Sequence, residues 1–205
     1  MAATYNTKIQ ASWRGPTSGS WFACGLLLWA AIWTAAASTM DAQQAPTEYQ
    51  VKAAYLFNFL KFVEWPDDPT RDSQGRWVIG VVGNSPIAGE LTQLVSAKSV
   101  NGHELQIKSF QPTEDLRACH ILFISASETK RLPSILTALR GSSVLTVGDV
   151  ENFNESGGMI QFVMEDGRVR FAIDVGATGR ARLKISSKLL SLARAVTGSE
   201  RSATN

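Results

Sequence analysis

The 205-residue sequence predicts an α/β fold: a sandwich built on a mixed, mainly parallel sheet, with helices on both faces and a C-terminal β-hairpin plus helix. Two observations support this prediction. Short apolar runs bounded by turn residues alternate with amphipathic helical segments over residues 47–147, as they do in parallel strands joined by crossover helices. Two alternating segments joined by a Glu165-Asp166-Gly167 turn follow, which indicates a hairpin at the end of the sheet.

The first predicted helix begins after Thr47, because Thr47 and Gln50 have the spacing of a capping box. We expect this helix to end near Glu64, since the Trp65-Pro66 pair disfavours helical backbone. Its apolar residues cover a broad arc, which is typical of a helix packed in a core. The alternative is that part of this aromatic face, near Phe57, contacts a partner.

Two short apolar runs are predicted to be buried strands, Trp77–Val82 and Ile121–Ile124. Glu104–Phe110 alternates like a strand after the Asn101-Gly102 turn, and Val144–Val147 is a fourth short strand. Helices are expected between them, one from Pro86 to about Ser96 and one from a Ser127 cap to Leu139. Pro133 lies inside the second helix, where proline is unfavourable.

The C-terminal part is predicted to contain a loop over residues 148–156, a hairpin over residues 157–175 and a final helix. Ser186 is the expected N-cap of that helix, and Gly198 follows its end. Its apolar residues fall on one face: Leu189, Leu190, Ala193 and Val196.

The N-terminus has the layout of a secretory signal peptide. Lys8 and Arg14 precede an apolar run over residues 21–37, and small residues follow. The alternative is a retained membrane anchor, although the run is at the short end of the ~17–25 residues that span a bilayer. We expect cleavage after residue 37 or 42, a single domain over residues 43–198 and a disordered tail over residues 199–205. The mature protein would then lie in the periplasm.

Charge and cysteine content limit the function further. Without residues 1–42 the formal net charge falls from +2 to +1, which makes nucleic acid a poor candidate ligand. Cys24 lies in the predicted signal peptide, so Cys119 is the only cysteine of the expected mature chain. No internal disulfide is then possible, and the fold must be stabilised by its core.

The sequence offers little chemistry. Cys119 and His120 are neighbours at a strand start, so their side chains point to opposite faces and cannot easily form a thiolate–imidazole pair. We expect Cys119 to be buried and His120 to be half-exposed. Residues 80–86 form a strand–glycine–helix segment but lack the third glycine of a dinucleotide fingerprint. The sequence therefore predicts no catalytic site, no metal site and no cofactor, and thus a protein that is not an enzyme.

Several blocks resemble the YfiR family: YQVKAAYLFNFLKFVEWP at residues 49–66, CHILFI at residues 119–124, the GGMIQF strand and the LKISSKLLSLA segment. The resemblance implies a periplasmic repressor that binds the periplasmic domain of an inner-membrane diguanylate cyclase. It also implies an outer-membrane-associated protein that releases the repressor, and a homodimer. Family members with disulfides pair the cysteine of the CHILFI-like strand with a second cysteine. In this chain the corresponding residue is Cys119, and the expected mature chain has no second cysteine to pair with it. Arg182 replaces a glycine that often precedes LKISS.

Five residues are candidates for partner contact. Phe153 is an aromatic residue in the polar loop 148–156, where it either plugs its own core or anchors a partner. The basic C-terminal segment adds Arg168, Arg170 and Lys184, and Phe57 belongs to the first helix.

The rival hypothesis is a periplasmic domain that binds a small ligand, accessory to transport or sensing. It predicts one deep polar pocket near the strand ends after Val82 and Val147, whereas a regulator predicts an exposed apolar patch.

Overall fold

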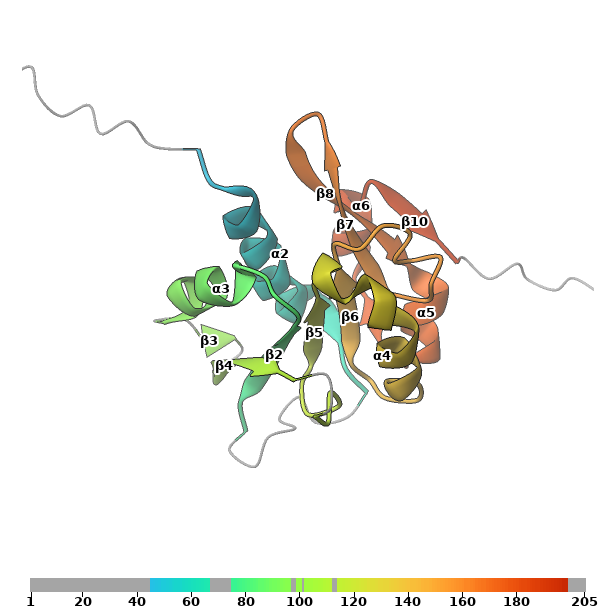
Figure 1. The fold of residues 1–205 in the computed structure, drawn as a ribbon, viewed down its shortest axis with the longest axis horizontal. Coiled ribbons are helices and arrows are strands. Elements are labelled where there is room, and N and C mark those ends of the chain that lie inside the picture. The colour runs from blue at the N-terminus through green and yellow to red at the C-terminus, as the bar shows by residue number, and fades with distance from the viewer. Residues whose placement is uncertain (1–44, 67–74, 97–98, 101, 112–113, 199–205) are drawn as a thin grey trace, which may run out of the picture. The chain divides into compact units, whose positions relative to one another are not determined.

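The computed structural model describes residues 45–66, 75–96, 99–100, 102–111 and 114–198 (Figure 1). The predicted signal peptide and the predicted disordered tail lie outside these residues. No helix in the described part of the chain combines the length and the hydropathy that a bilayer crossing requires.

The predicted α/β class is confirmed. An eight-stranded sheet has the order β10-β8-β7-β6-β5-β2-β4-β3. Five neighbouring strands are parallel: β4 (His103–Phe110), β2 (Trp77–Val82), β5 (Ile121–Ile124), β6 (Leu145–Gly148) and β7 (Ile160–Glu165). The sheet is mixed because β8 (Arg168–Asp174) is antiparallel to β7, and β3 (Ser99–Val100) is antiparallel to β4.

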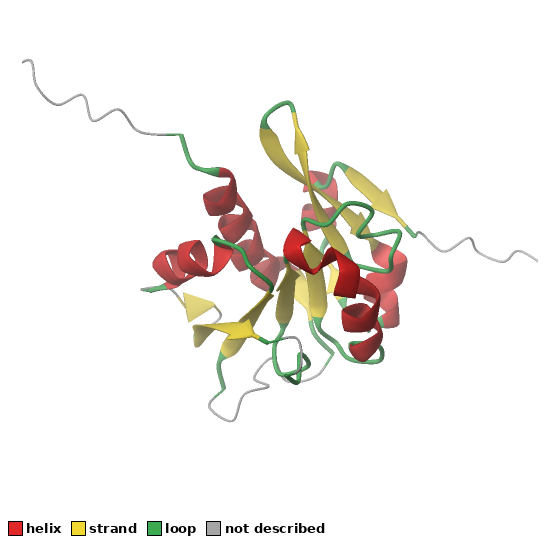
Figure 2. Ribbon diagram, in the orientation of Figure 1, coloured by secondary structure: helices red, strands yellow, loops and turns green. Residues whose placement is uncertain are grey.

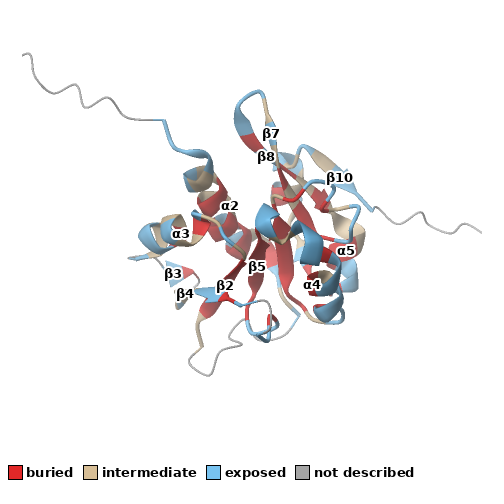
Figure 3. Ribbon diagram, in the orientation of Figure 1, coloured by how far each residue is buried: buried red, intermediate tan, exposed pale blue. Residues whose placement is uncertain are grey.

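Helices cover both faces of this sheet (Figure 2). In β2, Ile79 and Val81 face one core, against α2 (Glu48–Phe62) and α3 (Ile87–Val95), while Val78 and Val82 face the other, against α4 (Leu132–Ala138). Because the central parallel strands β2, β5 and β6 are covered on both faces, they are buried along their whole length. Figure 3 shows this buried layer between helices whose outer sides are exposed.

The first helix forms as the sequence predicts at its start. Thr47 Oγ1 accepts a hydrogen bond from the Gln50 N–H, and the Gln50 side chain accepts one from the Thr47 N–H, so the capping box is complete. The helix ends two residues earlier than expected. Val63 is already extended, because β1 (Val63–Glu64) pairs antiparallel with β9 (Lys184–Ile185) in a small second sheet.

Two details of the region after β5 differ from the prediction. The N-cap is Ser125 rather than Ser127, and it opens a 3₁₀ helix, η1 (Ala126–Arg131), before α4 begins. Pro133 therefore lies in the first turn of α4, where its missing N–H has no helical partner to lose.

The end of the chain differs more. Ser186 caps α6 (Ser187–Leu192) as predicted, but the helix stops at Leu192. Residues Ala195–Thr197 form β10, which pairs parallel with β8, so Val196 is a strand residue rather than part of the helix face. A short helix that the sequence analysis did not separate, α5 (Val175–Arg180), follows β8 directly.

Candidate functional site

The strand order places a topological switch point between β2 and β5. From β2 the chain passes through α3 on one face to β4, whereas from β5 it passes through η1 and α4 on the other face to β6. The loops after β2 and β5 therefore diverge at the carboxyl edge of the sheet. In open α/β sheets, this is where ligands most often bind.

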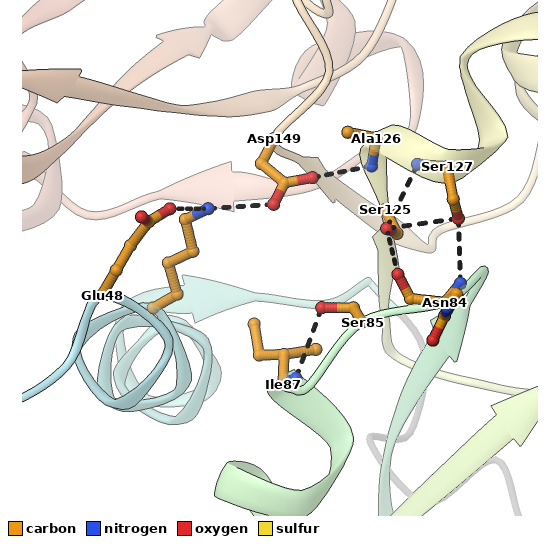
Figure 4. A network of polar contacts seen from close by, with 9 residues as sticks. Glu48, Asn84, Ser85, Ile87, Ser125, Ala126, Ser127 and Asp149 are labelled. Atoms are coloured by element: carbon orange, nitrogen blue, oxygen red, sulfur yellow. Dashed lines mark hydrogen bonds and ion pairs between the residues drawn. The ribbon is translucent and has the colours of Figure 1, made fainter.

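Polar groups of these two loops bind each other (Figure 4). The Asn84 N–H donates to Ser127 Oγ at 2.9 Å, and Ser125 Oγ donates to the Asn84 carbonyl at 2.9 Å. Gly83 makes this approach possible, because its φ is +92° and an added Cβ would lie 2.6 Å from Ser127 Oγ. The divergence point is thus closed by internal hydrogen bonds.

A buried lysine joins this edge to the first helix. Lys52 is 4% exposed, and its Nζ lies 2.6 Å from Glu48 Oε1 and 2.9 Å from Asp149 Oδ2. The other oxygen of Asp149 accepts a hydrogen bond from the Ala126 N–H at 2.9 Å. Figure 4 shows how the carboxylate links α2, the loop after β6 and the start of η1.

The charge state of Lys52 follows from this geometry. Burial lowers the pKa of its ammonium group, but the hydrogen bonds to Glu48 and Asp149 and their negative charges outweigh burial and raise the pKa. A lysine that acts as a nucleophile or as a base needs a lowered pKa. Lys52 is therefore held as a buried cation in an ion cluster with Glu48 and Asp149.

The best-formed cavities in the described part of the chain, of about 260 to 570 Å³, lie elsewhere. None of them is lined by a residue of the 83–85 or 148–149 segments. Within the described residues there is also no group of three His, Cys, Asp or Glu side chains placed to hold a metal ion.

Phe153 is the plug rather than the anchor. Its side chain is fully buried, and its ring lies against Gly148 and Gly158, since a Cβ added to either glycine would collide with the ring. Of the two roles expected for Phe153, the structure shows the plug into its own core. Together, Phe153 and Asp149 fix the loop that follows β6 at two points.

Phe57 is also buried, at 7% exposure, so it offers no contact surface. The reason is that α2 packs against both the sheet and α3, whose Ile87 and Leu91 belong to the same core as Phe57. The broad apolar arc of this helix is thus covered on two sides. From the sequence alone, such an arc looks the same as one with a side left exposed for a partner.

The three basic candidates are exposed but are not on one element. Arg168 and Arg170 lie on β8, opposite Glu165 and Val163 of β7 respectively. Together with Glu165 and Asp166 they line a cavity of about 260 Å³. Lys184 lies on β9, opposite Glu64 in the small second sheet. The hairpin arginines therefore remain candidates as a pair, apart from Lys184.

Cys119 and His120 point into opposite cores, as expected for strand neighbours. Cys119 is buried and its thiol donates to the Leu116 carbonyl at 3.3 Å. His120 is fully buried rather than half-exposed. Its Nδ1 accepts a hydrogen bond from the Val78 N–H at 3.1 Å, and its ring lies 4.6 Å from the Trp77 ring.

A protein-family model described as YfiR/HmsC-like matches residues 49–194. The chain belongs to this family. Proteins of this family are regulators in periplasmic diguanylate cyclase signalling. No protein of curated function matches the sequence.

Among solved structures, the chain is similar to a conserved domain protein from Vibrio cholerae O1 biovar El Tor. The identity is 12% and the TM-score is 0.47, over 73% of this chain and 60% of that protein. The chain thus spans less than two thirds of the length of that protein.

The residues that carry the family resemblance are mostly structural. The 49–66 block forms the core helix and supplies Lys52, and the 119–124 block supplies the buried Cys119, His120 and β5. The sequence analysis overlooked Lys52. The sequence does contain a pattern that indicates the ion pair. Lys52 lies within an apolar helix face, four residues after Glu48, and side chains four residues apart meet on one side of a helix.

Proposed function

We propose that this protein is a periplasmic repressor that binds the periplasmic domain of an inner-membrane diguanylate cyclase and lowers cyclic di-GMP signalling. The observation that carries the proposal is the family match across residues 49–194. Release by an outer-membrane-associated protein and a homodimeric state belong to the same proposal.

The carboxyl edge of the sheet supports a binding regulator over a carrier of small ligands. The carrier hypothesis requires open polar groups after Val82 and Val147. At those positions Asn84, Ser125, Ser127 and Asp149 are bound to one another, to Lys52 or to main-chain N–H and carbonyl groups. A ligand would have to break these contacts in order to enter.

The mechanism is a population shift. A repressor that binds the inactive conformation of the cyclase more tightly than the active one moves the equilibrium toward the inactive conformation. A tenfold preference supplies about 1.4 kcal/mol, and moving a population from 1:99 to 99:1 requires about 5.5 kcal/mol. The contact surface must therefore discriminate strongly between the two conformations.

Deletion of the gene tests the proposal. We expect cellular cyclic di-GMP to rise, and additional loss of one inner-membrane cyclase to reverse the rise and so identify the partner. Unchanged cyclic di-GMP after deletion, together with tight binding of a small metabolite by the purified protein, would favour the carrier.

Charge reversal tests the hairpin arginines. Complementation with Arg168→Glu plus Arg170→Glu should restore repression only in part, because both side chains are exposed on β8. The matched control is Lys130→Glu plus Arg131→Glu, which changes the charge equally on the exposed part of η1 and should repress like the wild type.

A further inference from the structure

A cavity of about 490 Å³ lies at the amino edge of the sheet, the edge opposite to the closed loops after β2 and β5. Its lining residues fall within three segments: 136–142 at the end of α4, 156–159 before β7, and 177–181 in and after α5 (Figure 1). Cavities that bind small molecules commonly measure about 300 to 1,000 Å³. We call this space the amino-edge cavity.

The strand register opens the sheet at this edge. In the continuous described stretch 114–198, the ladder between β6 and β7 consists of Val147 opposite Ile160 and Gly148 opposite Gln161. The first half of β6 therefore has no partner on β7, and Thr146 Oγ1 accepts a hydrogen bond from the Met159 N–H at 3.1 Å instead. The cavity lies where these two strands begin, so it follows from the fold rather than from a single side chain.

Buried apolar side chains form the floor of the cavity. Leu139 belongs to the core on the α4 face of the sheet, whereas Met159, Ala177 and Ala181 belong to the core on the α2 face. Each of the four is less than a tenth exposed. An apolar group that enters the cavity would cover this floor and lose contact with water, which favours binding.

The charged residues of the lining are both arginines, Arg140 and Arg180. Carboxylates are close in sequence, since Glu155 adjoins Ser156 of the lining and Asp174 is the N-cap of α5. Neither arginine, however, forms an ion pair with these two or with any other carboxylate of the described residues. Two positive charges at the cavity are thus left without internal compensation.

The other polar side chains of the lining have already used their donors. Ser142 Oγ donates to the Leu139 carbonyl at 2.6 Å, and Ser156 Oγ donates to the Asn152 carbonyl at 3.0 Å. The guanidinium groups are therefore the side-chain donors that the lining offers to a ligand. Their planar forks match the oxygen atoms of a carboxylate, a sulfonate or a phosphate.

We propose that the amino-edge cavity binds a small organic anion, whose apolar body lies on the floor and whose charged group contacts Arg140 and Arg180. The cavity joins α4, the start of β7 and α5, so a bound anion would hold these three elements together. This site is separate from the proposed repressor function, because its binding of an anion requires no cyclase.

The test compares two fluorescent probes on the purified protein. Anilinonaphthalene sulfonate has an apolar body and an anionic group, and phenylnaphthylamine has the same ring system without the sulfonate. Arg140→Gln plus Arg180→Gln should raise the Kd of the sulfonate at least about tenfold, because hydrogen bonds to a charged group are lost. The Kd of phenylnaphthylamine should change by less than about twofold, since the apolar floor stays intact. Lys130→Gln plus Arg131→Gln removes the same charge from exposed positions of η1 and should bind both probes like the wild type.

A second variant tests the position of the site. Ser156 is exposed at the cavity, so Ser156→Trp should fill it and abolish binding of both probes. The melting temperatures of all variants should stay close to that of the wild type, because the altered side chains are exposed.

Four outcomes overturn the proposal: no binding of the sulfonate to the wild type, equal binding to the arginine variant, equal binding to Ser156→Trp, and loss of both probes in the arginine variant. The last would show that the arginines shape the cavity without recognising an anion. Each outcome leaves the repressor proposal standing, because that proposal is tested by the level of cyclic di-GMP after gene deletion.

Discussion

At the residue scale, Lys52 shows how one polar side chain organises the fold. Its ammonium group is buried between two carboxylates, and Asp149 passes the connection to the start of η1. Removing one partner of a buried ion pair leaves the other charge without compensation, which costs more than the pair contributes. The network therefore ties α2 to the loop after β6.

Lys52→Met should lower the free energy of unfolding by roughly 2–3 kcal/mol, less than for a fully buried pair because Glu48 is partly exposed. The control is Lys61→Met in the same helix, whose exposed ammonium lies 4.4 Å from the Phe57 ring centre. Its loss should cost no more than about 1 kcal/mol. Urea denaturation measures both, and equal losses for the two variants would contradict the role assigned to Lys52.

The pH dependence of this contribution has a definite sign. The folded protein raises the pKa of Lys52 above its ordinary value, so the stabilisation is fully present below the unfolded pKa of about 10.4. It is lost as the pH rises through the folded pKa. The difference in unfolding free energy between the wild type and Lys52→Met should thus be constant from neutral pH to pH ~10 and shrink above it. A difference that grows with alkaline pH would show that the sign is wrong.

At the element scale, the loop after β6 is part of the core rather than a flexible connection. Phe153 fills the space that Gly148 and Gly158 leave open, and Asp149 binds Lys52 and Ala126. Its composition is polar, with Asp149, Glu151 and Glu155, so sequence reasoning could justify a plug or an anchor equally well.

Phe153→Ala should lower the free energy of unfolding by about 3–5 kcal/mol, because it removes a fully buried ring and leaves a cavity. Leu192→Ala is the control at an exposed position and should change stability by less than about 0.5 kcal/mol. Thermal denaturation distinguishes the two. A stable Phe153→Ala protein would return Phe153 to the candidate contact residues.

The elements that could be predicted from sequence are those with local signals. The Thr47 and Ser186 caps, the apolar run of β2 and the turn of the β7–β8 hairpin all depend on residues within a few positions of one another. The missed elements depend on distant partners. β10 exists because β8 offers a free edge, and β1 pairs with β9 from more than a hundred residues away.

At the scale of the whole molecule, the candidate site could also be predicted only where it depends on residues that are close in sequence. The arginines of the hairpin were visible as a local excess of positive charge, and they are exposed as expected. Sequence reasoning left the burial of Phe57 and Phe153 open, because packing against α3 or against two glycines is a tertiary property.

The central claim is that the protein represses a diguanylate cyclase by binding its periplasmic domain. The most direct measurement is the rate of cyclic di-GMP synthesis by the full-length cyclase in nanodiscs, where both sides of the membrane are accessible, as purified protein is added. We predict that the rate falls to a low plateau, and that the Arg168→Glu plus Arg170→Glu variant requires a higher concentration to reach it. A rate that stays constant at saturating wild-type protein would contradict the account.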